Sequence, residues 1–126
     1  MSSARALIVT LMALGEIAVG TIIAALPSFG EWLIGNPIDG SGVLITRMLG
    51  VAVLVIGITW WLARDEAHVP RILPGFLLYN FGIGALLAVA ARSASQPLVP
   101  WVFAVVHAAA GAACVVASLA RRHRSP

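Results

Sequence analysis

The chain has 126 residues, of which 60% are apolar and 10% are charged. Soluble domains carry about a quarter charged residues, so a soluble protein of this size could not cover so apolar a core. The formal net charge of +3 does not indicate a nucleic-acid partner, because no basic run is interleaved with exposed aromatic residues. The composition therefore predicts one domain whose main partner is a lipid bilayer.

Four apolar stretches predict membrane-spanning helices, at about residues 6–26, 43–63, 74–91 and 98–120. A helix rises about 1.5 Å per residue, so the stretch 43–63 covers roughly the 30 Å of a hydrocarbon core. The first stretch is longer than the apolar region of a signal peptide, and we interpret it as a retained span. Residues 27–42 are expected to form an interfacial loop. Within it, the helical spacing of Phe29, Trp32 and Leu33 predicts a short amphipathic turn.

The arginines predict the orientation of these spans. Six of them fall at the N-terminus, in the link 64–73 and at the C-terminus: Arg5, Arg64, Arg71, Arg121, Arg122 and Arg124. The loops on the other side carry Arg92. By the positive-inside rule both termini are cytoplasmic, and short loops join antiparallel neighbours. We therefore expect an all-α, up-down four-helix membrane bundle, with Trp32 and Trp101 at the outer interface and Trp60 and Trp61 at the inner one.

Polar residues interrupt all four spans. From the helical rise, Glu16, Asn80 and His107 lie about 13–16 Å below the outer ends, and Arg47 lies about 6 Å below. Charged groups in a bilayer point inward and pair, so we expect a buried Glu16–Arg47 ion pair with Asn80 and His107 hydrogen-bonded nearby. Small-residue stripes share these faces and predict close helix contacts; Gly20 follows Glu16, Gly50 and Gly57 follow Arg47, and Gly111 follows His107.

Each polar group also has a structural interpretation. The Glu16–Arg47 pair would serve either to fix the helix register or as part of a functional site. His107 is either a hydrogen-bonded core histidine or a ligand-binding or proton-carrying group. No metal site or cofactor is predicted, because a metal site needs three or four clustered ligands. The single cysteine, Cys114, is interpreted as a buried structural thiol.

Four segments carry a resemblance to known proteins: GEIAVGTIIAALPS, TRMLGVAVLVIGITWWLARDE, LLYNFGIGALLA and WVFAVVHAAAG. They resemble a group of small bacterial membrane proteins that are similar in plan to the DoxX-like four-helix proteins. The specific part consists of Glu16, the Arg47–Leu49–Gly50 pattern, Tyr79-Asn80 and His107. The resemblance implies a four-helix membrane bundle, and DoxX proteins are named for association with a quinol oxidase.

Three functions remain open from the sequence. The first is an inner-membrane protein whose central polar cluster, Glu16, Arg47, Tyr79, Asn80 and His107, binds a small lipophilic molecule or a quinone in a pocket between helices. The second is an accessory subunit of a respiratory or other membrane complex, or a homo-oligomer. The third is a membrane enzyme in which a protonated Glu16 acts as general acid on a lipophilic substrate.

Overall fold

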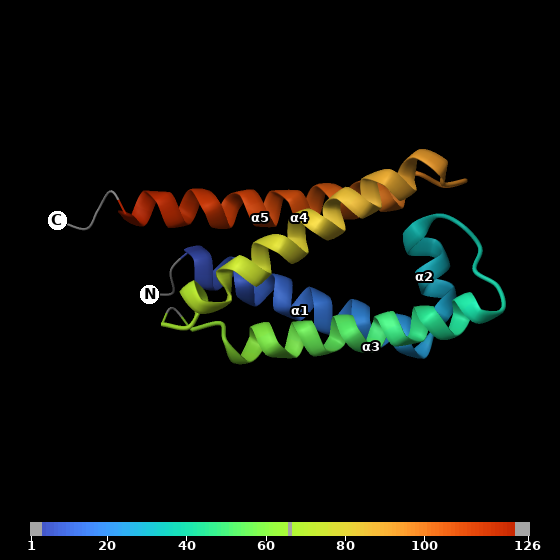
Figure 1. The fold of residues 1–126 in the computed structure, drawn as a ribbon, viewed down its shortest axis with the longest axis horizontal. Helices are drawn as coiled ribbons and strands as arrows, with labels where there is room; N and C mark the ends of the chain where they lie inside the picture. Colours follow the sequence, from blue (N-terminus) through green and yellow to red (C-terminus); the bar gives the residue numbers. More distant parts are fainter. Residues whose placement is uncertain (1–3, 66, 123–126) are drawn as a thin grey trace.

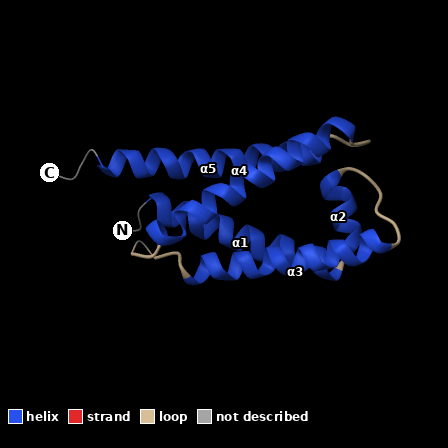
Figure 2. Ribbon diagram, in the orientation of Figure 1, coloured by secondary structure: helices blue, strands red, loops and turns tan. Residues whose placement is uncertain are grey.

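The computed structural model describes residues 4–65 and 67–122, which form five helices (Figures 1 and 2). They are α1 (Ala4–Ala25), α2 (Pro27–Ile34), α3 (Ser41–Leu62), α4 (Val69–Ser93) and α5 (Leu98–Arg122). Four are long and apolar enough to cross a membrane: α1, α3, α4 and α5. The four long helices cover the four apolar stretches, so the prediction that these stretches are helical is confirmed. Helix α2 lies within residues 27–42, where a short helical turn was expected. Arg124 lies outside the described residues.

Helix α4 begins earlier than the sequence indicates. The prediction started the third span at Pro74, whereas the helix starts at Val69 and includes Pro74. Pro70 occupies one of its first two positions, where a missing N–H costs nothing because those groups have no intrahelical acceptor. Pro74 has no N–H to donate to the carbonyl oxygen of Pro70, so the helix lacks this one bond, close to its start.

Helices α1 and α3 form a close antiparallel pair. A Cβ added at Gly57 would lie 2.7 Å from the backbone nitrogen of Ile17, and one at Gly20 would lie 2.8 Å from the carbonyl oxygen of Gly50. Gly50 in turn faces the backbone of Ala24. The two backbones therefore touch where the predicted glycine stripes meet, the contact that small residues permit in membranes.

Helices α4 and α5 form the second antiparallel pair. A Cβ on Gly84 would lie 3.2 Å from the carbonyl oxygen of Ala104, and one on Gly111 would lie 2.9 Å from Cζ of Phe81. At Gly111 the neighbouring group is the Phe81 ring, whereas in the α1–α3 pair the glycines face the backbone of the other helix. The α4–α5 contact therefore also depends on glycine, but one of its closest approaches is made by a side chain.

The two pairs meet at one end of the molecule and are bridged by α2 at the other (Figure 1). At the core end, where α1 starts and α3 stops, the packed side chains are Val9, Ala13, Trp60, Val69, Phe76 and Cys114. At the α2 end, the hydroxyl of Ser95 donates to the carbonyl oxygen of Gly35 at 2.7 Å, and the Trp32 ring meets Phe103 edge-on. Helix α2 thus holds the α1–α3 pair to the α4–α5 pair.

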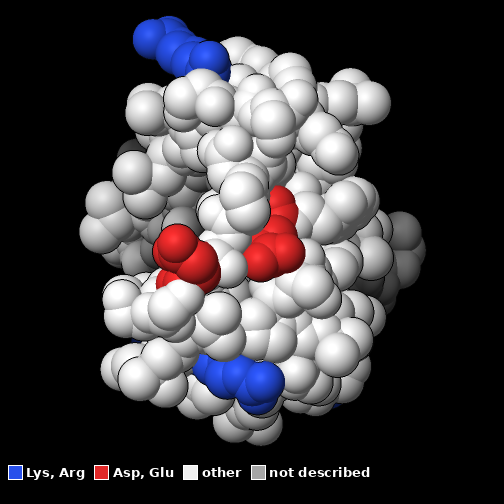
Figure 3. Space-filling model, turned by 90° about the vertical axis from the view of Figure 1, so that its right-hand side faces the viewer, with Lys and Arg blue, Asp and Glu red and all other residues white. Residues whose placement is uncertain are grey.

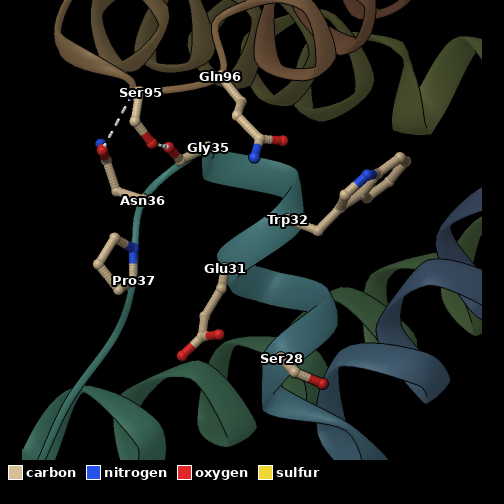
Figure 4. Close-up of a pocket in the computed structure, with 8 residues that line it drawn as sticks. All are labelled: Ser28, Glu31, Trp32, Gly35, Asn36, Pro37, Ser95 and Gln96. Carbon is tan, nitrogen blue, oxygen red and sulfur yellow. Dashed lines mark hydrogen bonds between the residues drawn. The ribbon is translucent and has the colours of Figure 1, made fainter.

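The face at the α2 end carries charges of both signs (Figure 3). Its acidic residues belong to the segment around α2, which contains Glu31 and Asp39. Glu31 lines a depression of about 300 Å³ with residues of the turn that follows α2 and of the α4–α5 connection. Figure 4 shows Glu31 and Trp32 pointing to different sides of α2. This depression therefore has a mixed lining, in which the Trp32 indole stands beside polar side chains such as Glu31.

Candidate functional site

Glu16 lies on the face of α1 that points into the molecule. The buried residues of α1 recur at helical spacing, and Glu16 falls in that series between Ala13 and Gly20. Its side chain is accordingly buried, with 5% of the residue exposed. Tyr79 from α4 donates its hydroxyl hydrogen to Glu16 Oε2 at 3.0 Å. This bond links the first helix pair to the second.

Asn80 and His107 form a second, adjoining link between α4 and α5. Asn80 is fully buried, and its side-chain nitrogen donates to the carbonyl oxygen of Phe76 at 2.9 Å. That bond turns Oδ1 of Asn80 toward Nδ1 of His107, 3.1 Å away. Because an amide oxygen accepts only, the hydrogen bond network assigns a hydrogen to Nδ1. In the neutral imidazole, Nε2 is then the acceptor.

His107 and Glu16 face each other without a direct hydrogen bond. Nε2 of His107 lies 3.9 Å from Oε1 of Glu16, a distance too long for a hydrogen bond but short enough for an ion pair if the ring is protonated. Tyr79 stands beside both groups, since its ring meets the His107 ring at a centroid distance of 5.8 Å. The structure therefore brings together four of the five residues in the predicted cluster.

Arg47 is the fifth, and its predicted ion pair with Glu16 is wrong. The residue is exposed, and its guanidinium donates to the carbonyl oxygen of Ala24 at 3.2 Å. Ala24 lies in the last turn of α1, whose carbonyl groups have no intrahelical donor and carry the negative end of the helix dipole. Arg47 thus caps α1. Its height, about 6 Å below the outer ends, already matches the end of α1 better than Glu16.

Trp60 is a site residue that the sequence interpretation missed. It was expected at the inner interface with Trp61, but it is 5% exposed and packs edge-on against Tyr79 with ring centroids 5.1 Å apart. The Trp61 ring instead lies under the Arg64 guanidinium. A sequence signal did exist, because Trp60 follows Val53 and Gly57 at helical spacing on the buried face of α3.

A cavity of about 580 Å³ lies between the helix pairs and reaches this cluster. Its polar side chains are Glu16, Tyr79 and His107, and the rest of its lining is apolar. Leu33 and Ile34 of α2 close it at the α2 end. Three lining residues from three helices are more than half exposed: Leu11, Leu49 and Leu86.

The polar groups lie nearer the core end of an elongated apolar space, in which Leu11 and Met12 of α1 line the part beyond Glu16. Along α4 the lining runs from Tyr79 to Ala90, which is about 16 Å at the helical rise. A molecule in the cavity would therefore place one polar end at Glu16 and its apolar body toward α2. The arrangement offers an acid, an imidazole and a phenol to a single bound group.

The other candidate groups lie elsewhere. Cys114 is buried in the core cluster at the core end, as a structural thiol would be. Among the described residues, no group of three or more His, Cys, Asp or Glu side chains is placed to hold a metal ion.

Comparison with known proteins adds no assignment. No protein-family model matches this chain, and neither the curated proteins nor the solved structures include a similar one.

Proposed function

We propose that this chain is a multi-pass protein of the bacterial inner membrane, with α1, α3, α4 and α5 crossing the bilayer in an up-down arrangement. The described part of the chain supports a multi-pass protein through four helices of mean hydropathy 1.9 to 2.2. The proposed orientation is inferred from the arginines: most of them lie in the segments that the fold places at the core end, which are the N-terminus, the α3–α4 link and the C-terminal part of the chain. In this arrangement both termini are cytoplasmic, and α2 lies at the outer interface.

Within that membrane the chain binds a small lipophilic molecule with one polar end. The observation that carries this proposal is the cavity of about 580 Å³, whose lining is apolar except for Glu16, Tyr79 and His107. Small-molecule sites have this size and this combination of apolar walls with a few converging polar groups. A quinone is one candidate ligand, which would suit the resemblance to DoxX-like proteins.

An enzymatic role is the second candidate. Asn80 orients His107, and His107 faces Glu16 across 3.9 Å. A carboxyl group beside an oriented imidazole is an arrangement suited to general acid–base chemistry on a bound substrate. The third alternative, an accessory subunit or homo-oligomer, needs no ligand and would leave the cavity filled by membrane lipid or by a neighbouring chain.

The test is to fill the cavity and to measure what the purified protein retains. Gly15 lines the cavity, and a Cβ placed there would meet nothing within 4 Å. The matched control is Gly82, which has the same free space and lies on the exposed side of α4. Protein extracted from native membranes is analysed by mass spectrometry for small lipophilic molecules, in the wild type, Gly15→Phe and Gly82→Phe.

We expect the wild type and Gly82→Phe to retain the same molecule in a fixed ratio to protein, and Gly15→Phe to lose it. Retention of one set of molecules by all three proteins would show adventitious lipid and overturn the binding proposal. A wild type that carries no molecule and co-purifies with a partner complex would favour the accessory subunit instead.

A further inference from the structure

The hydrogen bonds around Glu16 leave free acceptors on two residues that line the cavity. Tyr79 gives its hydrogen to Oε2 of Glu16, so Oε1 keeps its lone pairs. His107 gives its Nδ1 hydrogen to Asn80, so Nε2 of the neutral ring also offers a lone pair. These two acceptors are 3.9 Å apart in the part of the cavity nearer the core end. A group that satisfies both must bring at least two hydrogens.

The negative charge of an ionised Glu16 side chain also needs a partner. A carboxylate held within a bilayer pairs with a cation or becomes neutral. Arg47 does not fill this role, because its guanidinium binds the carbonyl oxygen of Ala24. One proton shared by Glu16 and His107, on either the carboxyl oxygen or Nε2, makes the pair neutral. Without that proton the pair carries one negative charge and two acceptors.

We propose that the ligand in this cavity is a lipophilic amine, whose ammonium group binds between Glu16 and His107 in place of their shared proton. This inference rests on the proposed function and names its ligand class. An ammonium nitrogen has three hydrogens and one positive charge, and it can lie about 2.9 Å from both acceptors because they are less than twice that distance apart. The apolar body of the amine then extends toward Leu33 and Ile34 of α2.

The exchange balances in charge and in hydrogens. The neutral pair binds one R–NH₃⁺ and releases one H⁺, so the net charge at the site within the membrane does not change. An alcohol of the same shape carries no charge, so it cannot replace the shared proton. It can bind only the protonated pair, where it accepts a hydrogen bond from the shared proton, donates its own hydrogen to the other acceptor and releases no proton. The cavity therefore discriminates between amine and alcohol at Glu16, while its apolar walls treat the two alike.

The groups that face Glu16 come from two helices. They are Tyr79 of α4 and His107 of α5. The charged residues of the other elements packed against α1 point elsewhere: Arg47 of α3 binds Ala24, and Glu31 of α2 accepts from the backbone nitrogen of Ile38. On α1 itself, Arg5 lies about 16 Å from Glu16 along the helix axis. Competition between proton and amine is thus set at the Glu16–His107 pair.

The experiment compares two fluorescent probes of matched shape, 1-pyrenemethylamine and 1-pyrenemethanol. Their binding to the full chain in phosphatidylcholine nanodiscs is followed by fluorescence anisotropy, with empty discs as the blank. Measurements are made at about pH 6 and about pH 8, where a primary amine stays protonated. Glu16→Gln keeps an acceptor for Tyr79 and removes the charge. Glu31→Gln makes the same change outside the cavity.

For the wild type and Glu31→Gln we expect the amine to bind about tenfold or more tightly than the alcohol, because the amine alone supplies the missing charge. The amine affinity should fall at the lower pH, because protons compete for the pair, while the alcohol affinity stays constant. Glu16→Gln should bind both probes alike and show no pH dependence. In weakly buffered solution, an indicator dye should report about one proton released per amine bound to the wild type.

Equal binding of the two probes to the wild type, or amine binding with no proton release, would overturn the amine inference and leave the proposed cavity function standing. Saturable binding of neither probe to the wild type would instead refute the cavity function itself. The proton measurement uses the wild type alone, so the inference stays testable if Glu16→Gln does not fold. Alcohol binding to Glu16→Gln shows independently that its cavity persists.

Discussion

Tyr79 is the residue through which the two helix pairs share their polar cluster. Its hydroxyl reaches Glu16 on α1, while its ring packs between Trp60 of α3 and His107 of α5. Hydrogen bonds between helices in a membrane are worth about 0.6–2 kcal/mol each, so one bond does not hold the bundle together. Its effect is to fix where the carboxyl group points, and therefore which acceptor faces the cavity.

Tyr79→Phe tests this bond directly. The change removes the hydroxyl and keeps the ring, so Glu16 loses its donor while the aromatic contacts remain. We expect the free energy of unfolding to fall by about 1 kcal/mol. The measurement is reversible unfolding in mixed detergent micelles, followed by circular dichroism.

The matched control is Thr59→Val, which removes an exposed hydroxyl that bonds within its own helix to the carbonyl oxygen of Val55. We expect that variant to stay close to the wild type. A Tyr79→Phe protein as stable as Thr59→Val would contradict the assigned bond between Tyr79 and Glu16.

Helical rise predicts the depth of these residues, but it does not predict which way each helix faces. Depth alone places Glu16, Asn80 and His107 at one level, and the structure brings them together there. Depth alone also leaves Arg47 free to reach either Glu16 or the end of α1. The rotation of α3 decides between the two, and that rotation follows from Gly50 packing on Ala24.

At the scale of elements, backbone contact is concentrated between α1 and α3. Gly20, Gly50 and Gly57 let these helices approach until a single added carbon would strike backbone atoms. Such a contact cannot relax by rotating a side chain.

Gly50→Ala should therefore be costly for so small a change. Its Cβ would lie 2.9 Å from the Cα of Ala24 and equally close to the Gly20 carbonyl oxygen. Overpacking of this kind costs about 1–3 kcal/mol, measured by the same micellar unfolding. Gly82→Ala is the control, because nothing lies within 4 Å of its added carbon. Equal stability of the two variants would contradict the close α1–α3 contact.

For the whole molecule, hydropathy predicts the number and length of the crossings but not the space between them. The cavity is lined mostly by leucine, isoleucine and valine, and residues of the same types, such as Leu44 and Leu78, are exposed on these helices without lining the cavity. In water an apolar stripe marks the core, whereas in a bilayer apolar residues suit both surfaces. The resulting shape, packed at the core end and hollow toward α2, follows from helix angles that a linear pattern does not encode.

Orientation is the whole-molecule property that charge does predict, and single cysteines can test it. Asp39 follows α2 and Ala67 precedes α4, and both are exposed. The native Cys114 is buried, so the wild type serves as the unlabelled control.

In intact spheroplasts a membrane-impermeant maleimide should label Asp39→Cys and leave Ala67→Cys unlabelled, and both should react after permeabilisation. This result follows because arginines near span ends are retained in the cytoplasm. Labelling of Ala67→Cys alone in sealed cells would place the termini outside, and α2 would then lie on the cytoplasmic side.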